Sequence, residues 1–100
     1  MQTVPLKLIT IITEAILEER IIREIRQLGA KGYTISEVRG EGSRGIHASD
    51  WEGKNSKIEL LVSAEVAARI FNYVADQFFA HYAVIVYAQD VQVIRSEKYQ

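Results

Sequence analysis

The sequence predicts an α+β fold in which strands and helices follow in the order βαββαβ. Apolar runs rich in β-branched residues alternate with two stretches of helical periodicity, and a glycine-rich polar stretch separates the two halves. The halves also repeat, because a shift of 50 residues pairs Leu8 with Ile58, and Ile12 with Val62. Two copies of one βαβ unit predict a ferredoxin-like domain with a four-stranded antiparallel sheet.

The first half begins with a strand and a helix. Residues 6–13 are apolar and β-branched, and Pro5 stands at their entrance, where its missing amide hydrogen does least harm. From Glu14 the period becomes helical, with an apolar side made of Leu17, Ile21, Ile25 and Leu28. Gly29 follows directly and is well placed to end this helix in a left-handed conformation.

The middle of the chain is predicted to be a strand, a long loop and a further strand. A β-leaning run follows Gly32 and ends at about Arg39. Residues 40–55 hold four glycines, mixed charges and few apolar side chains, so they predict a loop between strands two and three. Strand character resumes over residues 56–63.

The last elements are a helix and a strand. Ser63 can cap the helix, whose predicted buried side is Val66 or Ala67, Ile70, Phe71, Val74 and Phe78. Residues 83–88 are a dense apolar strand, which Val91, Val93 and Ile94 extend after a break at Asp90.

Apolar residues occupy both alternating sets of positions in the strands, as in the run Leu8, Ile9, Ile11 and Ile12. Both helices of this architecture cover one face of the sheet, so the other face would be wet in a monomer. A monomer rarely exposes so much apolar surface, and a cyclic homotrimer would bury it. The alternative is that some of these residues lie at strand ends under the helices.

The composition limits the class of protein. A chain of 100 residues is expected to be one domain spanning 1–100, and it has no cysteine for disulfides or thiolate sites. The net charge of -1 excludes the basic field that drives non-specific nucleic-acid binding. The apolar runs are shorter than the ~20 residues of a membrane helix, and no signal-peptide pattern is present. We expect a cytoplasmic protein.

The loop contains the strongest candidate site. Its start, Gly40-Glu41-Gly42-Ser43-Arg44-Gly45, matches GxGxxG, but no helical period follows as a dinucleotide fingerprint requires. A different anion site remains open, since glycines expose backbone amides, Ser43 adds a hydroxyl and Arg44 adds a bidentate cation. The alternative is a solvated loop whose glycines only form turns.

Other candidate residues point to binding rather than catalysis. His47 near Asp50 lacks further ligands at metal spacing, and His81 is expected to interact with the end of the second helix. Trp51 is either an anchor for a partner or a residue that folds back on its own domain. No Ser, His and acid lie in motif spacing, so we expect neither an enzyme nor a metal site.

Three segments resemble the PII-like proteins of the SbtB type, which regulate the sodium-dependent bicarbonate transporter SbtA. These are Lys31-Gly32-Tyr33-Thr34, Gly40 to Arg44, and Tyr82 to Tyr87. The resemblance spans nearly the whole chain. It implies a homotrimer that binds an adenine nucleotide (cAMP, AMP, ADP or ATP) between subunits. A long effector loop, the T-loop at about 40–55, would contact the transporter at the inner face of the plasma membrane.

The resemblance also implies site residues. Ser43 and Arg44 match phosphate contacts, and the other implied nucleotide contacts are Gly40, Gly42, His47, Tyr82, Ala83 and Val84. The implied partner contacts are Arg44, Ile46, His47 and Trp51. Relatives have a lysine, an arginine and a glycine where this chain has Glu41, His47 and Val84, so a weaker or differently tuned site is expected.

Alternative functions remain open at this stage. An acylphosphatase would need an arginine-bearing loop after the first strand, where this chain has Thr13-Glu14-Ala15. A nitrogen-sensing PII protein would bind ATP with 2-oxoglutarate, and a CutA-like trimer would bind metal.

Overall fold

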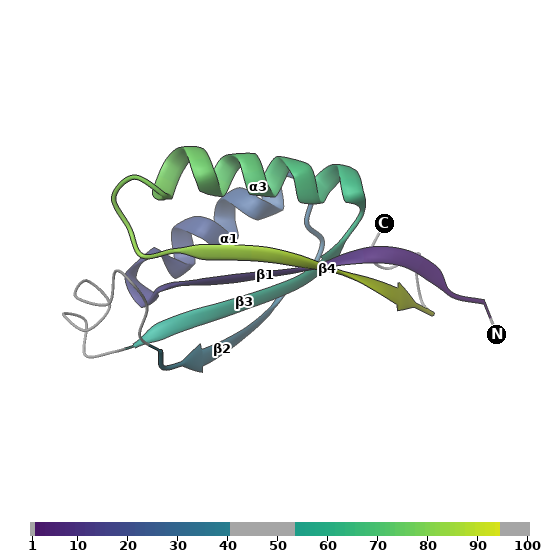
Figure 1. Cartoon of the computed structure of the whole chain (residues 1–100), viewed down its shortest axis with the longest axis horizontal. Coiled ribbons are helices and arrows are strands. Elements are labelled where there is room, and N and C mark those ends of the chain that lie inside the picture. The colour runs from purple at the N-terminus through teal and green to yellow at the C-terminus, as the bar shows by residue number, and fades with distance from the viewer. Residues whose placement is uncertain (1, 41–53, 95–100) are drawn as a thin grey trace.

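The elements follow one another in the predicted order. The computed structural model describes residues 2–40 and 54–94. Its elements are β1 (Val4–Glu14), the short 3-10 helix η1 (Ala15–Leu17), α1 (Glu18–Gln27), β2 (Thr34–Val38), β3 (Asn55–Val62), α3 (Ala64–Phe78) and β4 (Ile85–Val93) (Figure 1). The βαββαβ order is therefore confirmed.

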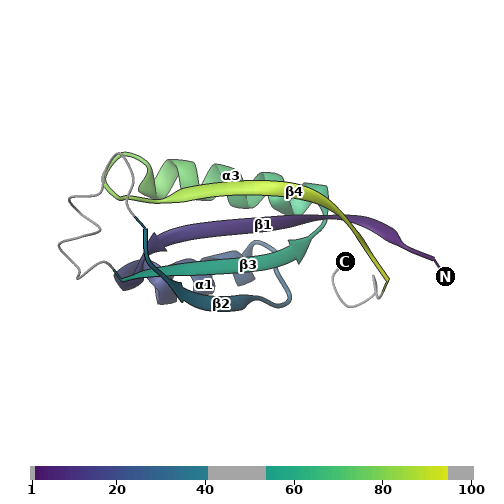
Figure 2. The ribbon, with the colours of Figure 1, turned by 60° about the horizontal axis from the view of Figure 1, so that its bottom comes forward.

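The four strands form one antiparallel sheet in the order β2-β3-β1-β4 (Figure 2). The two helices lie side by side on one face of this sheet (Figure 1). Strand β1 is central, because Leu8 pairs with Leu61 of β3 on one side and with Gln89 of β4 on the other. This is the ferredoxin-like arrangement that the repeat predicts.

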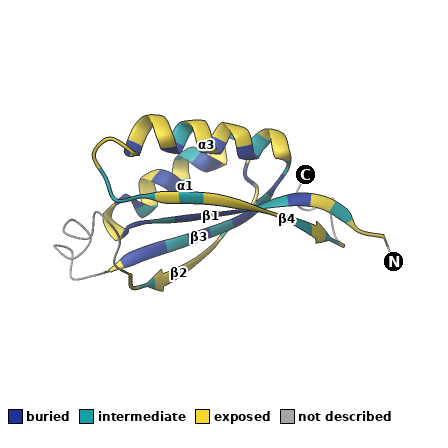
Figure 3. Cartoon of the chain, in the orientation of Figure 1, coloured by how far each residue is buried: buried dark blue, intermediate teal, exposed yellow. Residues whose placement is uncertain are grey.

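The core lies between the sheet and the helices (Figure 3). Alternate residues of β1 and β3 face the helices and are buried, among them Ile9, Ile11 and Ile58, each 0% exposed. The helices contribute Leu17, Ile21, Ile25, Ala67, Ile70, Val74 and Phe78 to the same cluster. Burial of side chains of this size stabilises a fold by about 1.5–3 kcal/mol each, which explains why these two layers stay together.

Helix α1 ends in a Schellman motif at Gly29. The amide of Gly29 donates to the Arg26 carbonyl at 3.2 Å, and the amide of Ala30 donates to the Ile25 carbonyl at 3.0 Å. Gly29 has φ 121°, where side chains are strained, and an added Cβ would lie 3.0 Å from Cγ2 of Val66. The glycine predicted to end this helix is favoured by its backbone conformation, and the close approach of Val66 adds to that preference.

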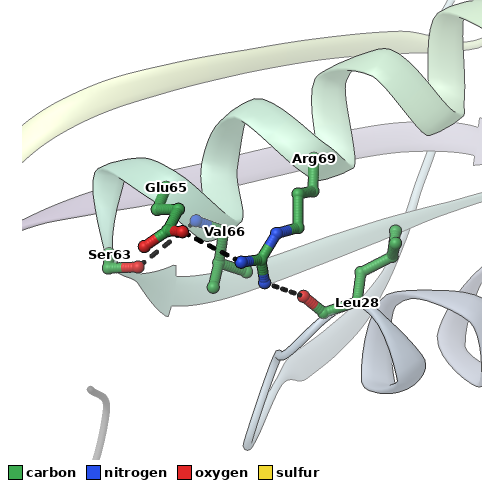
Figure 4. Close-up of polar contacts among 5 residues, drawn as sticks. All are labelled: Leu28, Ser63, Glu65, Val66 and Arg69. Atoms are coloured by element: carbon green, nitrogen blue, oxygen red, sulfur yellow. Dashed lines mark hydrogen bonds and ion pairs between the residues drawn. The ribbon is translucent and has the colours of Figure 1, made fainter.

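Helix α3 begins beside that motif. The Ser63 hydroxyl oxygen accepts from the Val66 amide at 3.2 Å, which confirms the predicted cap (Figure 4). Arg69 donates through Nη1 to the Leu28 carbonyl at 3.2 Å and through Nη2 to Oε1 of Glu65 at 3.1 Å (Figure 4). We call this region, formed by Leu28, Gly29, Ser63 and Arg69, the capped end.

Two local expectations were wrong. Phe71 is 37% exposed, since the buried residues of α3 keep the spacing of one narrow stripe and Phe71 lies at its edge. Asp90 does not break the last strand, which runs unbroken over Ile85–Val93. Asp90 pairs across the sheet with Lys7 and forms an ion pair with its ammonium group, so the charge is accommodated within the ladder.

The face of the sheet away from the helices carries apolar side chains, as the strand pattern predicts. Leu8 and Ile12 alternate with the buried residues of β1, and Ile85 and Tyr87 of β4 are 53% and 40% exposed. None of the helices in the described residues is long and apolar enough to cross a membrane.

Candidate functional site

One end of the molecule, opposite to the capped end, brings together three connections. Strand β1 ends there at Glu14, β2 and β3 border the segment 41–53 there, and α3 turns into β4 there (Figures 1 and 2). The pairings of Asn55 with both Glu14 and Val38 tie the three strands at this edge. We call this region, formed by Glu14, Gly40, Asn55 and the segment Tyr82–Val84, the loop end.

The structure brings some of the predicted site residues to one end. Gly40 is exposed, and Tyr82, Ala83 and Val84 are half-buried, all at the loop end. A Cβ added at Gly40 would meet no atom within 4 Å, so space within this chain does not require a glycine there. Two parts of the predicted site, which are far apart in sequence, therefore lie at the same end of the sheet, although β2 and β4 are its opposite edges.

The remaining predicted residues lie outside the described residues. These are Gly42, Ser43, Arg44, Ile46, His47 and Trp51, together with Glu41. Their assignment to phosphate or partner stays a prediction. β2 ends at Val38, one residue before the predicted strand end at about Arg39, and β3 begins at Asn55, the last residue of the predicted loop 40–55.

The segment Tyr82–Val84 has a fixed backbone. The Tyr82 amide donates to the Phe78 carbonyl at 2.9 Å, and the Val84 amide donates to the Tyr82 carbonyl at 3.1 Å, which closes a three-residue turn. The amide of Ala83 donates to Oε2 of Glu14 at 3.1 Å. The Tyr82 ring meets the buried Phe78 ring edge to face, with centroids 5.8 Å apart. Each amide of the segment is thus hydrogen-bonded.

Sequence reasoning missed a group of buried polar side chains at the loop end. Glu14, Asn55 and Ser56 are 4%, 7% and 4% exposed. The Ser56 hydroxyl donates to Oε1 of Glu18 at 2.6 Å. Thr13 is fully buried, and its hydroxyl has no hydrogen-bond partner among the described residues. The only signal in the sequence is that a threonine and a glutamate end a mostly apolar strand.

A metal site is not visible in the part of the chain that the structure describes. Within residues 2–40 and 54–94, no three His, Asp or Glu side chains gather as metal ligands would. His81 follows α3 and is exposed. His47 lies outside these ranges, so the expectation of no metal stays a prediction.

A groove of about 440 Å³ lies elsewhere, between α1 and the outer strand β2. Arg23, Tyr33 and Ile35 line it, and the Arg26 guanidinium lies 5.3 Å from the centre of the Tyr33 ring. No residue of the predicted nucleotide site lines this groove.

The fold matches that of known proteins along the whole chain. The family model described as Nitrogen regulatory protein P-II matches residues 6–98. A PII-like signalling protein from Thermus thermophilus has 55% sequence identity and a TM-score of 0.86, with 100% of each chain covered.

Two structures of CPII from Thiomonas intermedia are also similar. One has ADP, AMP and acetate bound, with 28% identity and a TM-score of 0.87. The other has ADP and bicarbonate bound, with 29% identity and a TM-score of 0.85. In both cases 99% of this chain and 98% of that chain are covered.

Proposed function

This chain belongs to the nitrogen regulatory protein P-II family, and on that premise we propose that it is a PII-like regulator that binds adenine nucleotides at the loop end. Proteins of this family are signalling regulators and not enzymes. The ligand would be AMP or ADP, with cAMP and ATP as further candidates, and bicarbonate would bind beside it. The whole chain, 1–100, would act as one PII-like domain.

One observation carries the proposal: CPII, which is similar over nearly its full length, has ADP with AMP or bicarbonate bound. The loop end of this chain supports it independently. Gly40 and the segment Tyr82–Val84 lie at the same end, and the segment has a fixed backbone that a flat base could pack against. Preorganised backbone reduces the entropic cost of binding a ligand.

Different residues of the proposed site would contact different parts of the nucleotide. Ser43 and Arg44 would bind the phosphate, because a hydroxyl and a bidentate guanidinium suit phosphate oxygens. Gly40 and Gly42 would form the base of the loop, and Tyr82–Val84 would line the base of the nucleotide. Glu41 would oppose a phosphate by its charge, while His47 supplies less positive charge than an arginine, so the affinity would be tuned downward.

The active form would be a homotrimer with its sites between subunits. The exposed Ile85 and Tyr87, with Leu8 and Ile12 on the same face, supply the apolar surface for self-association. Light scattering at micromolar concentration should give three times the chain mass of 11.4 kDa. A single-chain mass would exclude the trimer and any site that needs two subunits.

Calorimetry tests the ligand. AMP, ADP, ATP and cAMP are titrated with and without bicarbonate. The separate arms with 2-oxoglutarate and copper test the nitrogen-sensing function, which the family description favours as second candidate, and the CutA-like alternative. We expect AMP or ADP to bind without 2-oxoglutarate. Binding of ATP only together with 2-oxoglutarate would favour the nitrogen-sensing function instead.

Two single arginine substitutions, one in the proposed site and one on α1, test the phosphate contact. Arg44→Ala should weaken AMP binding about tenfold or more, since a charge-assisted bidentate contact is lost. Arg23→Ala on α1 is the matched control, because no residue of the predicted nucleotide site lines the groove to which Arg23 belongs. Equal AMP affinity of the Arg44 variant and the parent would remove Arg44 from the site.

The partner would be the bicarbonate transporter SbtA, contacted by the T-loop through Arg44, Ile46, His47 and Trp51. The protein would be cytoplasmic and reversibly recruited to the inner face of the membrane. Deletion of residues 46–53 should abolish capture of the transporter from membranes while the trimer remains. If capture survives the deletion, the contact lies on another surface.

A further inference from the structure

Glu14 has an unusual environment for an acidic side chain. It is only 4% exposed, and a buried carboxylate is costly unless hydrogen bonds compensate for the lost water. Glu14 occupies the N-cap position of η1, where the short side chains of Ser, Thr, Asp or Asn commonly accept from the helix amides. Its side chain makes no such bond. It accepts instead from the Ala83 amide, 69 residues away in sequence.

That bond completes the backbone of the Tyr82–Val84 segment. The amides on either side of Ala83 are bonded within the segment or to the end of α3. Ala83 is the central residue of the three-residue turn, and its amide has Glu14 as the partner that the structure shows. A bond from an amide to a carboxylate is stronger than a bond between neutral groups. The shape of the segment therefore depends on a side chain from the first strand.

Glu14 also adjoins the border of the loop. It is the residue of β1 opposite Asn55, and Asn55 is opposite Val38 of β2. Two residues earlier, Ile12 pairs with Ile85, the first residue of β4. Glu14 thus lies where the strands that border the loop meet the segment before β4.

We infer that Glu14 is a positioning residue, which holds the Tyr82–Val84 segment in the shape that receives the base and ribose of the ligand. The inference rests on the proposed function, since it assigns a role at the same site. Glu14 acts through the Ala83 amide, and its effect falls on the nucleoside part of the ligand. Arg44, by contrast, would act on the phosphate alone.

Three variants isolate this role. Glu14→Leu removes the acceptor and keeps an apolar side chain of similar length. Glu14→Gln keeps a side-chain carbonyl that can accept from the Ala83 amide. Ser56→Ala removes the neighbouring bond to Glu18, another part-buried long-range hydrogen bond of the loop end that does not involve the segment.

The first measurement is hydrogen exchange of the amides of residues 82–84 by NMR, in the full chain. In Glu14→Leu the Ala83 amide should exchange about tenfold faster or more, because a hydrogen bond to a charged group is lost. Glu14→Gln should stay within about threefold of the parent, since a neutral acceptor remains. Ser56→Ala should leave this amide unchanged. An unchanged Ala83 amide in Glu14→Leu would overturn the inference.

The second measurement is affinity for adenosine and for AMP. Glu14→Leu should weaken both about equally, by tenfold or more, whereas Arg44→Ala should weaken AMP alone. Glu14→Gln should restore binding, and Ser56→Ala should bind as the parent does. Parallel losses in Ser56→Ala, or faster exchange without loss of adenosine affinity, would also overturn the inference. If the parent binds no adenine compound, the proposed function fails, and hydrogen exchange alone then decides whether Glu14 holds the segment.

Discussion

The capped end and the loop end join the same two layers by different kinds of bonds. At the capped end, α1 ends in its own Schellman motif and α3 begins with its own serine cap, so most bonds join residues close in sequence. At the loop end, local backbone bonds close the turn before β4, but the side-chain bonds join distant residues, as Glu14 to Ala83 and Ser56 to Glu18. The capped end is built from local geometry, whereas the loop end forms only when the whole sheet has assembled.

This difference has a functional meaning. Local caps fix the junctions of strands and helices whatever happens elsewhere. The side-chain bonds of the loop end, by contrast, hold segments in place that are far apart in sequence. The loop end is thus suited to recognition and the capped end to stability.

The largest effect is expected at Phe78, a core residue whose ring packs against Tyr82 of the loop end. Its ring is 0% exposed and contacts the rings of Tyr73 and Tyr82 edge to face, and the Arg20 guanidinium lies 4.9 Å from its centre. Phe78→Ala should lower the free energy of unfolding by about 3–5 kcal/mol in urea titrations. Phe78→Leu should lose clearly less. Similar losses in both would mean that the aromatic contacts, and not the filled volume, stabilise this region.

A pair of glycines tests the capped end. Gly29→Ala should cost about 1–3 kcal/mol, since φ 121° strains any residue with a Cβ and the new Cβ would also crowd Cγ2 of Val66. Gly32→Ala is the matched control, because a Cβ there meets no atom within 4 Å. It should change stability by less than about 0.5 kcal/mol. Equal effects in thermal unfolding would contradict the role given to Gly29.

The serine cap should matter less. Ser63→Ala should lower stability by about 1 kcal/mol, because the Val66 amide loses its acceptor. Ser63→Asp keeps an acceptor at the cap and should retain most of the stability. Since the capped end is distant from the proposed site, AMP affinity should stay unchanged in both variants. A change in AMP affinity would show that the two ends are coupled.

The smallest effect is expected at Tyr73, on the face of α3 toward α1. Burial, and then the Glu24 carboxylate, raise the pKa of Tyr73 above its ordinary value of 10.0. In the folded state Tyr73 therefore keeps its proton up to a higher pH than in the unfolded state. Its contribution to the free energy of unfolding is complete below pH 10 and is lost as pH rises through the raised pKa. In urea titrations from about pH 9 to 11, Tyr73→Phe should lose less stability than the parent. If stability falls equally with pH in the variant and the parent, the ionisation of Tyr73 does not contribute to the loss of stability at high pH.

At neutral pH the same substitution should be nearly silent. The Tyr73 hydroxyl is buried and has no hydrogen-bond partner among the described residues, so little is lost with it.

The comparison also explains what the sequence could predict. Gly29 and Ser63 were identified correctly because a helix end depends on residues a few positions apart. The bond from Glu14 to Ala83 was missed because a single sequence carries no signal for contacts 69 residues apart. Asp90 was misjudged for the same reason, since its partner Lys7 lies in the first strand.

For the site, the sequence predicted Gly40 through the glycine-rich pattern of the loop as well as through the family resemblance, but it predicted Tyr82–Val84 through the resemblance alone. That resemblance is confirmed at the level of the PII-like family, and the SbtB type stays a prediction. The residues from Gly42 to Trp51 lie outside the described residues, so their roles stay predictions too.

The central place of β1 also constrains how the chain folds. The first strand pairs with the last, as Val4 with Val93, 89 residues apart. Pairings of such high contact order form slowly, because a long loop must close before any bond compensates for its entropy. Until β4 docks, β1 presents an unpaired apolar edge that could add strands from other chains. A chain shortened before residue 85 should therefore aggregate. By pairing with β1, the last strand prevents other chains from adding to that edge.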